Sequence, residues 1–213
     1  MQKAFTLKPK KKSRRKSAPW NKGISVGRRL PLNIKQIQSI RSHLKSAQKI
    51  RDLALFNLAI DSSLNAINVV QLRVSDVAKG SRILSLATIK PVESQRPIQF
   101  EISAETRESV AAWLAHVNLK PSDYLFPSRL QASPHLSTRQ YAKHVTSWVN
   151  AIGLDPSRYG TQSLRRTKPA LIYQQTENLV VAQLLLGHSR LRSTARFFGI
   201  EDWSRFKGLG VVR

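Results

Sequence analysis

Two clusters of basic residues in the C-terminal third of the chain have the side chains best suited to bind phosphate. Arg165, Arg166 and Lys168 form the first cluster, and Arg190 and Arg192 form the second. A guanidinium group can bind a phosphate through two parallel hydrogen bonds, and a lysine adds a mobile point charge. The pattern indicates phosphate binding. The alternative is that these residues are ordinary solvated positions on helix faces.

The overall charge points to a polyanionic partner. The chain has 213 residues, with 36 Lys and Arg against 12 Asp and Glu, a formal net charge of +24 and a pI near 11.4. Neutralised phosphates release condensed counterions, so we expect a nucleic acid as the partner. An anionic membrane is the weaker alternative, because no basic amphipathic helix with an aromatic face is evident. The 41% hydrophobic content suffices for a folded core.

The first 29 residues differ in composition from the rest. They hold 11 Lys and Arg residues and no acid, with Pro, Ser and Gly between them. Such a segment is expected to be disordered in isolation and to contact DNA, although it could serve only as a solubilising tail. We therefore predict a basic tail over 1–29 and one folded domain over 30–213. The predicted DNA contacts in the tail are Lys10, Lys11, Lys12, Arg14, Arg15 and Lys16, and Lys90 is added from the domain.

Several kinds of site find no support in the composition. Cysteine is absent, and the five histidines are scattered without metal-ligand spacing. We expect neither a metal nor a cofactor. No apolar run approaches the roughly 18 residues of a membrane span, and no apolar segment follows the basic N-terminus as in a secretory signal. These features predict a soluble, cytoplasmic and nucleoid-associated protein.

Hydrophobic periodicity predicts the secondary structure. Helical spacing appears in 34–44 and 53–60, and helices are expected after Ser103 and Ser137, which can act as N-caps. Residues 82–89 and 96–102 are β-rich and predict a hairpin or small sheet. Residues 163–198 predict two or three helices with a break at 187–188. The expected fold is mainly α with a small antiparallel β-sheet, an α+β class.

Three short motifs carry a resemblance to a known family. They are Ser163-Leu164-Arg165-Arg166-Thr167, Leu185-Leu186-Gly187-His188-Ser189 and Ser193-Thr194-Ala195-Arg196. Together with Leu72-Arg73-Val74-Ser75-Asp76-Val77 and Arg96-Pro97-Ile98, they resemble the catalytic domain of tyrosine recombinases, the phage integrase family, over about residues 30–200. The resemblance implies a metal-free site in which a tyrosine attacks a DNA phosphodiester. Two arginines and a histidine neutralise the phosphate, a lysine protonates the leaving oxygen, and a further histidine assists proton transfer.

Most positions that match the family's catalytic residues hold another residue type. By resemblance, Asn65 stands for the first arginine, Glu93 for the lysine and Gln162 for the first histidine, while Arg165 and His188 are retained. The nucleophilic tyrosine falls at Phe197, nine residues after His188, and no tyrosine follows Tyr173. Lys90 could substitute for the lysine if the loop is shaped differently. Tyr173 itself is predicted to pack in the hydrophobic interior.

The leading hypothesis is a DNA-binding protein without strand-cleavage activity, working in recombination or integration. It could act alone, with a second copy, or with an active recombinase in a synaptic complex. One alternative is an active enzyme whose nucleophile is Tyr173, Ser193, Thr194 or a tyrosine from a partner subunit. The other alternative is a nucleic-acid-binding protein that acts through charge alone, in which case the tail would provide most of the affinity.

Overall fold

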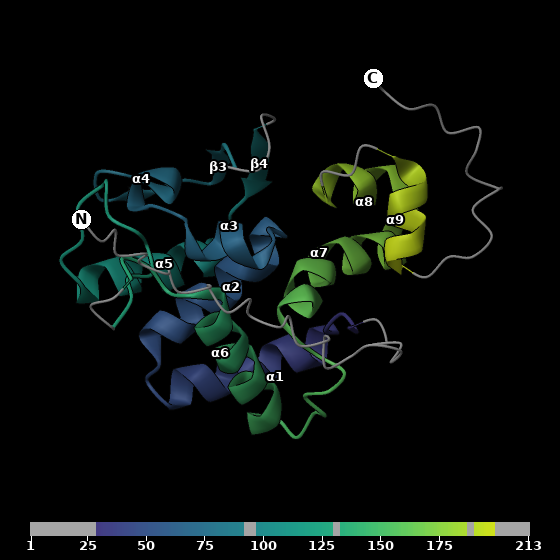
Figure 1. Cartoon of the computed structure of the whole chain (residues 1–213), viewed down its shortest axis with the longest axis horizontal. Helices are drawn as coiled ribbons and strands as arrows, with labels where there is room; N and C mark the ends of the chain where they lie inside the picture. Colours follow the sequence, from purple (N-terminus) through teal and green to yellow (C-terminus); the bar gives the residue numbers. More distant parts are fainter. Residues whose placement is uncertain (1–28, 92–96, 130–132, 187–189, 199–213) are drawn as a thin grey trace, which may run out of the picture.

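The computed structural model describes residues 29–91, 97–129, 133–186 and 190–198, and in the last range the side chains only as far as Ala195. Helices dominate this part of the chain (Figure 1). They are α1 (Ile34–Ser46), α2 (Ile50–Ser62), α3 (Ala66–Val70), α4 (Val74–Val77), α5 (Ala104–His116), α6 (Thr138–Ala151), α7 (Thr161–Thr176), α8 (Leu179–Leu186) and α9 (Leu191–Phe198). The mainly α prediction with a minor antiparallel β component is confirmed.

Side-chain caps explain why three of these helices begin where they do. The Asn33 side chain accepts a hydrogen bond from the Gln36 backbone N–H at 2.9 Å, and Gln36 returns one to Asn33 N. The Ser103 and Ser137 hydroxyls accept from backbone N–H groups three residues on, in α5 and α6. Each cap satisfies an N–H that the helix itself leaves unpaired. The predicted starts at Ser103 and Ser137 are therefore confirmed.

The β-structure is divided into two small antiparallel sheets. Strand β3 (Leu86–Ile89) pairs with β4 (Ile98–Glu101), with Leu86 opposite Glu101 and Ile89 opposite Ile98. Strand β2 (Arg82–Ile83) pairs instead with β1 (Ala78–Lys79). The prediction of a hairpin is confirmed for β3 and β4, but the prediction that 82–89 forms one strand of it is wrong. A β-rich run does not specify its partner, and the Leu84 N–H bonds back to the Val77 carbonyl at 2.8 Å.

Helix α2 lies at the centre of the hydrophobic core. Every residue of α2 from Ala54 to Ser62 is buried, and α5, α7 and α1 pack around it. Phe56 of α2 meets Trp148 of α6 edge to face, with ring centroids 5.6 Å apart. A helix that is apolar on nearly all sides can be stable only when other elements surround it. Because α2 is held in the core, its two ends have fixed positions. A different candidate site, described below, lies near each end.

The C-terminal helices form a smaller cluster against α7. Leu179 of α8 and Leu191 and Ala195 of α9 are buried together, and Tyr173 and Val180 pack on them partly buried. Figure 1 shows α8 and α9 on the far side of α7 from α2. Helix α8 ends at Leu186 and α9 begins at Leu191, and the predicted break at Gly187-His188 lies outside the described residues. Tyr173, which was predicted to pack in the interior, contacts this cluster but is only half-buried. Within the described ranges, no helix is both long and apolar enough for a membrane span.

Asp52, at the start of α2, binds two side chains of α6. Its Oδ2 accepts a hydrogen bond from the Trp148 Nε1–H at 3.1 Å and lies 3.3 Å from His144 Nδ1. Burial opposes ionisation, but the hydrogen bonds from His144 and Trp148, with the charges of His144 and Lys49, outweigh it and lower the pKa of Asp52. The folded state therefore favours the ionised carboxylate.

Replacing Asp52 with Asn is expected to lower the free energy of unfolding by about 1–2 kcal/mol at pH 7. Because the folded pKa lies below the unfolded value of about 4, this contribution is present above pH ~4 and is lost as pH falls through the folded pKa. Urea unfolding of both proteins across pH 3–7 measures the difference. Glu108→Gln, an exposed change of the same chemistry on α5, should have little effect. A constant difference down to pH 3 would contradict this account.

Candidate nucleic-acid interface

The turn between α2 and α3 positions the first of the predicted site residues. Ser63 ends α2 in the left-handed backbone conformation, with φ of 50°, and so turns the chain away from the helix axis. Asn65 then caps α3, and its Oδ1 accepts a hydrogen bond from the Asn68 N–H at 2.9 Å. Asn65 therefore has a structural role that its sequence position did not reveal. A capping role suits asparagine, which is among the strongest N-cap residues.

Arg165 is held inside the surface where α7 meets α8. Its Nη2 donates a hydrogen bond to the Leu186 carbonyl at 3.1 Å, and the side chain is half-buried. Its Nε is buried, with no acceptor among the described residues. Burial lowers the pKa of Arg165, because desolvation penalises the guanidinium cation. No carboxylate of the described part of the chain forms an ion pair with this cation, so a phosphate would complete its electrostatic environment.

The bond from Arg165 to Leu186 also joins two motifs that are separate in the sequence. Leu186 is the last residue of α8 and lies two positions before His188, which is outside the described residues. The α7 motif thus lies beside the end of the helix that leads to the Gly187-His188 pair. The sequence motifs alone do not specify this contact, which depends on α7 and α8 packing against each other.

Arg29, the first described residue, is hydrogen-bonded next to α7. The Arg29 guanidinium donates to the carbonyls of Pro156 and Tyr159, both at 3.2 Å, and to that of Ser157. In return, Arg166 Nη1 donates to the Arg29 carbonyl at 3.2 Å. The predicted DNA-contacting tail, which lies outside the described residues except for Arg29, therefore precedes a point fixed beside Arg166. Sequence patterning did not reveal this attachment.

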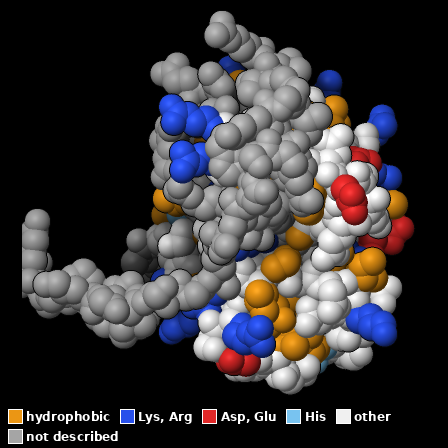
Figure 2. Space-filling model, turned by 90° about the vertical axis from the view of Figure 1, so that its right-hand side faces the viewer, with side chains coloured by type: hydrophobic (Ala, Val, Ile, Leu, Met, Phe, Trp, Pro, Cys, Tyr) orange, Lys and Arg blue, Asp and Glu red, His pale blue; other side chains and the backbone are white. Residues whose placement is uncertain are grey.

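The other predicted phosphate-binding residues are distributed around this region. Gln162 is exposed in the first turn of α7, and Lys168 is half-buried two turns later. Arg190 and Arg192 are exposed where α9 begins. Phe197 belongs to α9, but its side chain is not described, and Glu93 lies outside the described residues. In Figure 2, which shows the α8–α9 side, Lys and Arg side chains are spread over the visible face and acidic ones lie mostly toward its right-hand edge.

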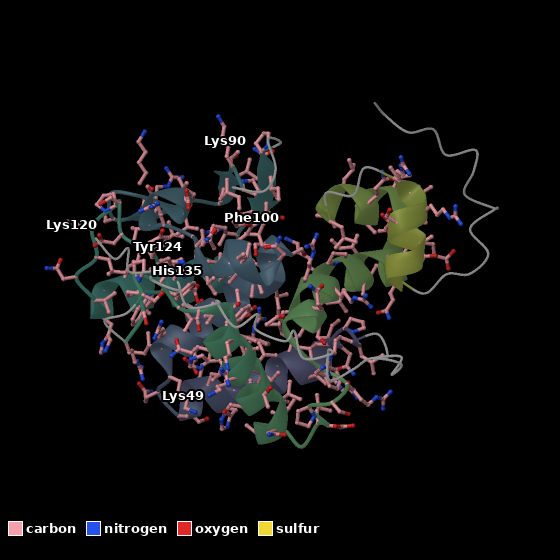
Figure 3. All side chains as sticks on the ribbon, in the orientation of Figure 1. Lys49, Lys90, Phe100, Lys120, Tyr124 and His135 are labelled. Atoms are coloured by element: carbon pink, nitrogen blue, oxygen red, sulfur yellow. The ribbon has the colours of Figure 1, made fainter. Side chains whose placement is uncertain are left out.

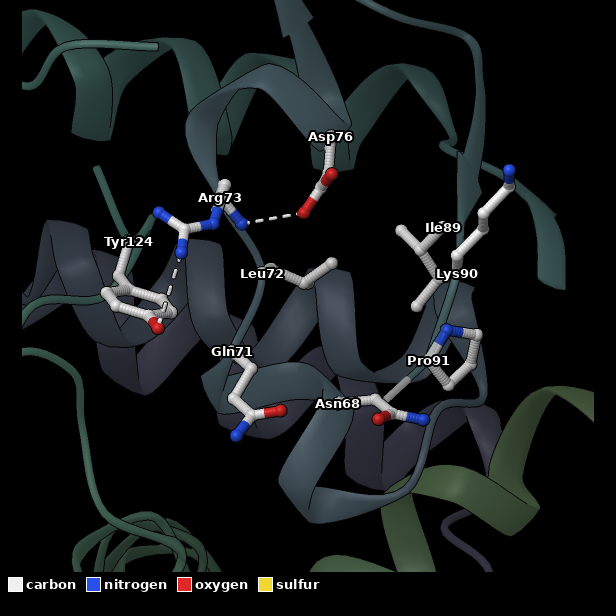
Figure 4. A pocket seen from close by; sticks show the side chains of 9 residues that line it. All are labelled: Asn68, Gln71, Leu72, Arg73, Asp76, Ile89, Lys90, Pro91 and Tyr124. Carbon is white, nitrogen blue, oxygen red and sulfur yellow. Dashed lines mark hydrogen bonds between the residues drawn. The ribbon is translucent and has the colours of Figure 1, made fainter. Parts of the chain in front are cut away.

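Lys90 lies at the end of β3 beside a polar cavity of about 240 Å³. Figure 4 shows its ammonium group pointing away from the cavity. The Arg73 guanidinium stacks over the Tyr124 ring at 4.5 Å, and the Arg73 backbone N–H donates to Asp76 at 2.7 Å. The polar lining is completed by Asn68 and Gln71. Sequence reasoning missed this cavity, because Tyr124 joins it from a distant loop.

Comparison with known proteins gives the family. The Phage integrase family model matches residues 31–201. "Probable integrase/recombinase YoeC" of Bacillus subtilis is 28% identical over 170 residues, which cover 80% of this chain and 88% of that protein. "Tyrosine recombinase XerC" of Erythrobacter litoralis is 28% identical over 75% of this chain and 49% of its own length. The chain thus spans nearly all of one relative but only half of the other.

Solved structures show the same fold. XerH site-specific recombinase bound to its difH substrate superposes with a TM-score of 0.65 at 20% identity, covering 80% of this chain and 50% of that one. XerA recombinase superposes with a TM-score of 0.68 at 15% identity, covering 83% and 62%. The resemblance inferred from the motifs around Arg165 is therefore confirmed by independent sequence and structural matches. This chain belongs to the phage integrase family and has the fold of the tyrosine recombinase catalytic domain.

Proposed function

We propose that the protein binds double-stranded DNA through the surface around α7 and does not cleave it. The observation that supports DNA binding is the state of Arg165, a half-buried cation that donates to the Leu186 carbonyl and whose Nε has no acceptor among the described residues. A DNA phosphate would supply the missing negative charge and a further acceptor. XerH, which shares this fold, was solved bound to its difH substrate, and the Tn1549 transposon integrase in complex with transposon right end DNA.

The proposal that the protein does not cleave DNA rests on the residue types at the six positions that match the family's catalytic residues. Asn65 replaces an arginine, a loss that could cost about 10³-fold or more by analogy with arginine fingers. Gln162 cannot transfer protons, a role worth about 10²- to 10⁴-fold. These factors do not multiply independently, since catalytic groups act as a unit. Phe197 is decisive, because a phenyl ring has no oxygen to attack phosphorus.

The substitute nucleophiles have unfavourable surroundings. Thr194 is completely buried in α9. Tyr173 packs half-buried against the Leu179 cluster, and Ser193 is exposed. A hydroxyl nucleophile needs an adjacent base, and Gln162 is not one. These surroundings support the non-cleaving proposal over an unusual nucleophile in the same chain.

A DNA-binding protein of this family without cleavage would occupy recombination or integration sites. It would act there alone, with a second copy of itself, or with an active recombinase in one complex, and it would associate with the nucleoid. The charge of the first 29 residues would add affinity that does not depend on DNA sequence. The surface around Arg165 would supply the fixed orientation that a flexible basic segment lacks.

Mapping the DNA recovered with the tagged protein from its host cells tests both parts of the proposal, DNA binding and the lack of cleavage. After denaturing SDS washes, we expect discrete sites only when a chemical crosslinker has been applied. Discrete sites without crosslinker would mean a covalent intermediate and would contradict the non-cleaving proposal. The absence of discrete sites in both samples would contradict site-specific binding and would favour attraction by charge alone.

A matched variant extends the test to the nucleophile position. Phe197→Tyr restores the hydroxyl but leaves Asn65, Glu93 and Gln162 unchanged, so we expect no covalent adduct on the mapped DNA sites in a denaturing gel. An adduct in this variant would show that the remaining residues still support cleavage and that position 197 alone silences it.

A further inference from the structure

A second group of cations surrounds a cavity at the opposite end of α2 from Asn65. The cavity has a volume of about 330 Å³, and its polar lining comes from Arg51, Arg129, Gln140, Lys143, His144 and Ser147. Helix α2 has 13 residues, so its two ends lie about 18 Å apart. Figure 3 shows Lys49, the residue before α2, low in the view, and Lys90, at the end of β3, near its top. None of the residues that line the cavity belongs to α7, α8 or α9, so the cavity is distinct from the surface around Arg165.

The charges around this cavity do not balance. Arg51, Arg129 and Lys143 are cationic, and within the described part of the chain none of them forms an ion pair. Asp52, which follows Arg51 in the sequence, is engaged by His144 and Trp148. Like charges gathered without a counterion repel one another, and that repulsion is relieved when an anion binds between them.

Arg51 provides an independent sign of a missing partner. Its side chain is almost completely buried, with 8% of the residue exposed, and Nη2 donates to the Pro127 carbonyl at 2.6 Å. Its Nε is also buried and has no acceptor among the described residues. Burial lowers the pKa of Arg51 and the nearby charge of Arg129 lowers it further, while the Asp52 carboxylate only partly opposes the shift. The guanidinium also lies over the Trp113 ring, 5.9 Å from its centroid. The Nε–H nevertheless stays a buried donor without an acceptor, which is costly and rare in native proteins.

We propose that this cavity, between the start of α2 and one face of α6, is a second phosphate-binding site of the protein. Its volume is several times the roughly 30 Å³ that one water molecule occupies in the liquid, so a phosphate group fits. Arg51 gives a fixed guanidinium, and the exposed Arg129 and Lys143 provide adaptable charge. The amide of Gln140 and the hydroxyl of Ser147 add neutral hydrogen-bond donors. The phosphate belongs either to the backbone of bound DNA or to a free phosphorylated small molecule.

The indole N–H of Trp148 is a built-in reporter, because it donates to Asp52 at the edge of this cluster. We expect inorganic phosphate, titrated into the ¹⁵N-labelled full-length protein, to move the Trp148 indole signal saturably, whereas chloride at equal ionic strength does not. Arg129→Gln and Lys143→Gln should each weaken phosphate binding about tenfold, the usual effect of losing one charged hydrogen bond. Lys120→Gln, an exposed charge on the far side of α5, should leave it unchanged.

Equal shifts with phosphate and chloride, or equal phosphate affinity in all variants, would overturn the site. The source of the phosphate follows from a second titration with a short DNA duplex. If the duplex moves the same signal and both variants weaken DNA binding, the DNA backbone supplies the phosphate. If the duplex binds without moving the Trp148 indole signal, the ligand of this cavity is a free phosphorylated molecule. Failure of the duplex to bind at all would count against the proposed function and not against this site.

Discussion

Deleting residues 1–28 is expected to weaken binding to duplex DNA on the order of 10²-fold near physiological salt, without abolishing it. The deleted segment carries 10 of the 36 Lys and Arg residues and no acid, and Arg29 is kept because it is bonded to the 156–159 turn. If about half of these charges contact phosphates, the slope of log K against log salt should become shallower by about 5. Fluorescence anisotropy with a labelled duplex at several salt concentrations measures both quantities. The remaining affinity is expected because the domain keeps a net positive charge and the Arg165 surface.

A control separates the charge of this segment from its sequence. A full-length chain in which residues 1–28 are shuffled keeps the same charge and should bind non-specific DNA like the original. Arg29 stays in place in the shuffled chain, because it is bonded to the 156–159 turn. Complete loss of binding in the deletion variant would contradict the proposed role of the domain surface and would favour a protein that binds through charge alone.

Arg165→Ala is expected to weaken specific DNA binding by about 10- to 100-fold, the usual effect of losing a charged hydrogen bond to phosphate. The salt slope should change by only about 1, since a single phosphate contact is removed. Arg165→Lys keeps the charge but loses the planar guanidinium. Its DNA affinity should therefore lie between those of the original chain and of Arg165→Ala. Arg82→Ala, an exposed change on β2, serves as the matched control.

The change at Arg165 also removes the bond to the Leu186 carbonyl, so α8 could become less stable. Thermal unfolding of the same variants distinguishes the two effects. If Arg165→Ala weakens DNA binding while its melting temperature stays close to that of the original chain, the loss is local to the phosphate contact. Unchanged DNA affinity in Arg165→Ala would show that this arginine is only structural, and the proposed DNA-binding surface would be wrong.

The local elements of the fold were largely predictable from the sequence. Helical periodicity from Ile34 to Leu44 and the caps at Ser103 and Ser137 each depend on residues within a few positions, and all were found as expected. The short helices α3 and α4 were missed, because four or five residues are too few for a period to emerge. The pairing of β2 with β1 was missed because a β-rich run has no intrinsic partner.

The candidate sites also divide into one that the sequence predicted and one that it did not. Arg165 was identified from its motif, since the residues that define that motif are consecutive. The cavity beside Arg51 was not identified. Arg51 bonds to Pro127, 76 positions away, and the cluster is completed from α6. No spacing rule connects residues so far apart.

The sequence by itself determined the family, the helical character, the charge and the residue types at the matched catalytic positions, because each is a property of composition or of short consecutive motifs. Only the tertiary structure decided which cations share a cavity, that Asn65 caps α3, and that Arg29 is fixed beside α7. The physical reason is that hydrophobic burial of α2 and α7 brings distant segments together. Side chains then take their hydrogen-bond partners from whichever segments that packing places within reach.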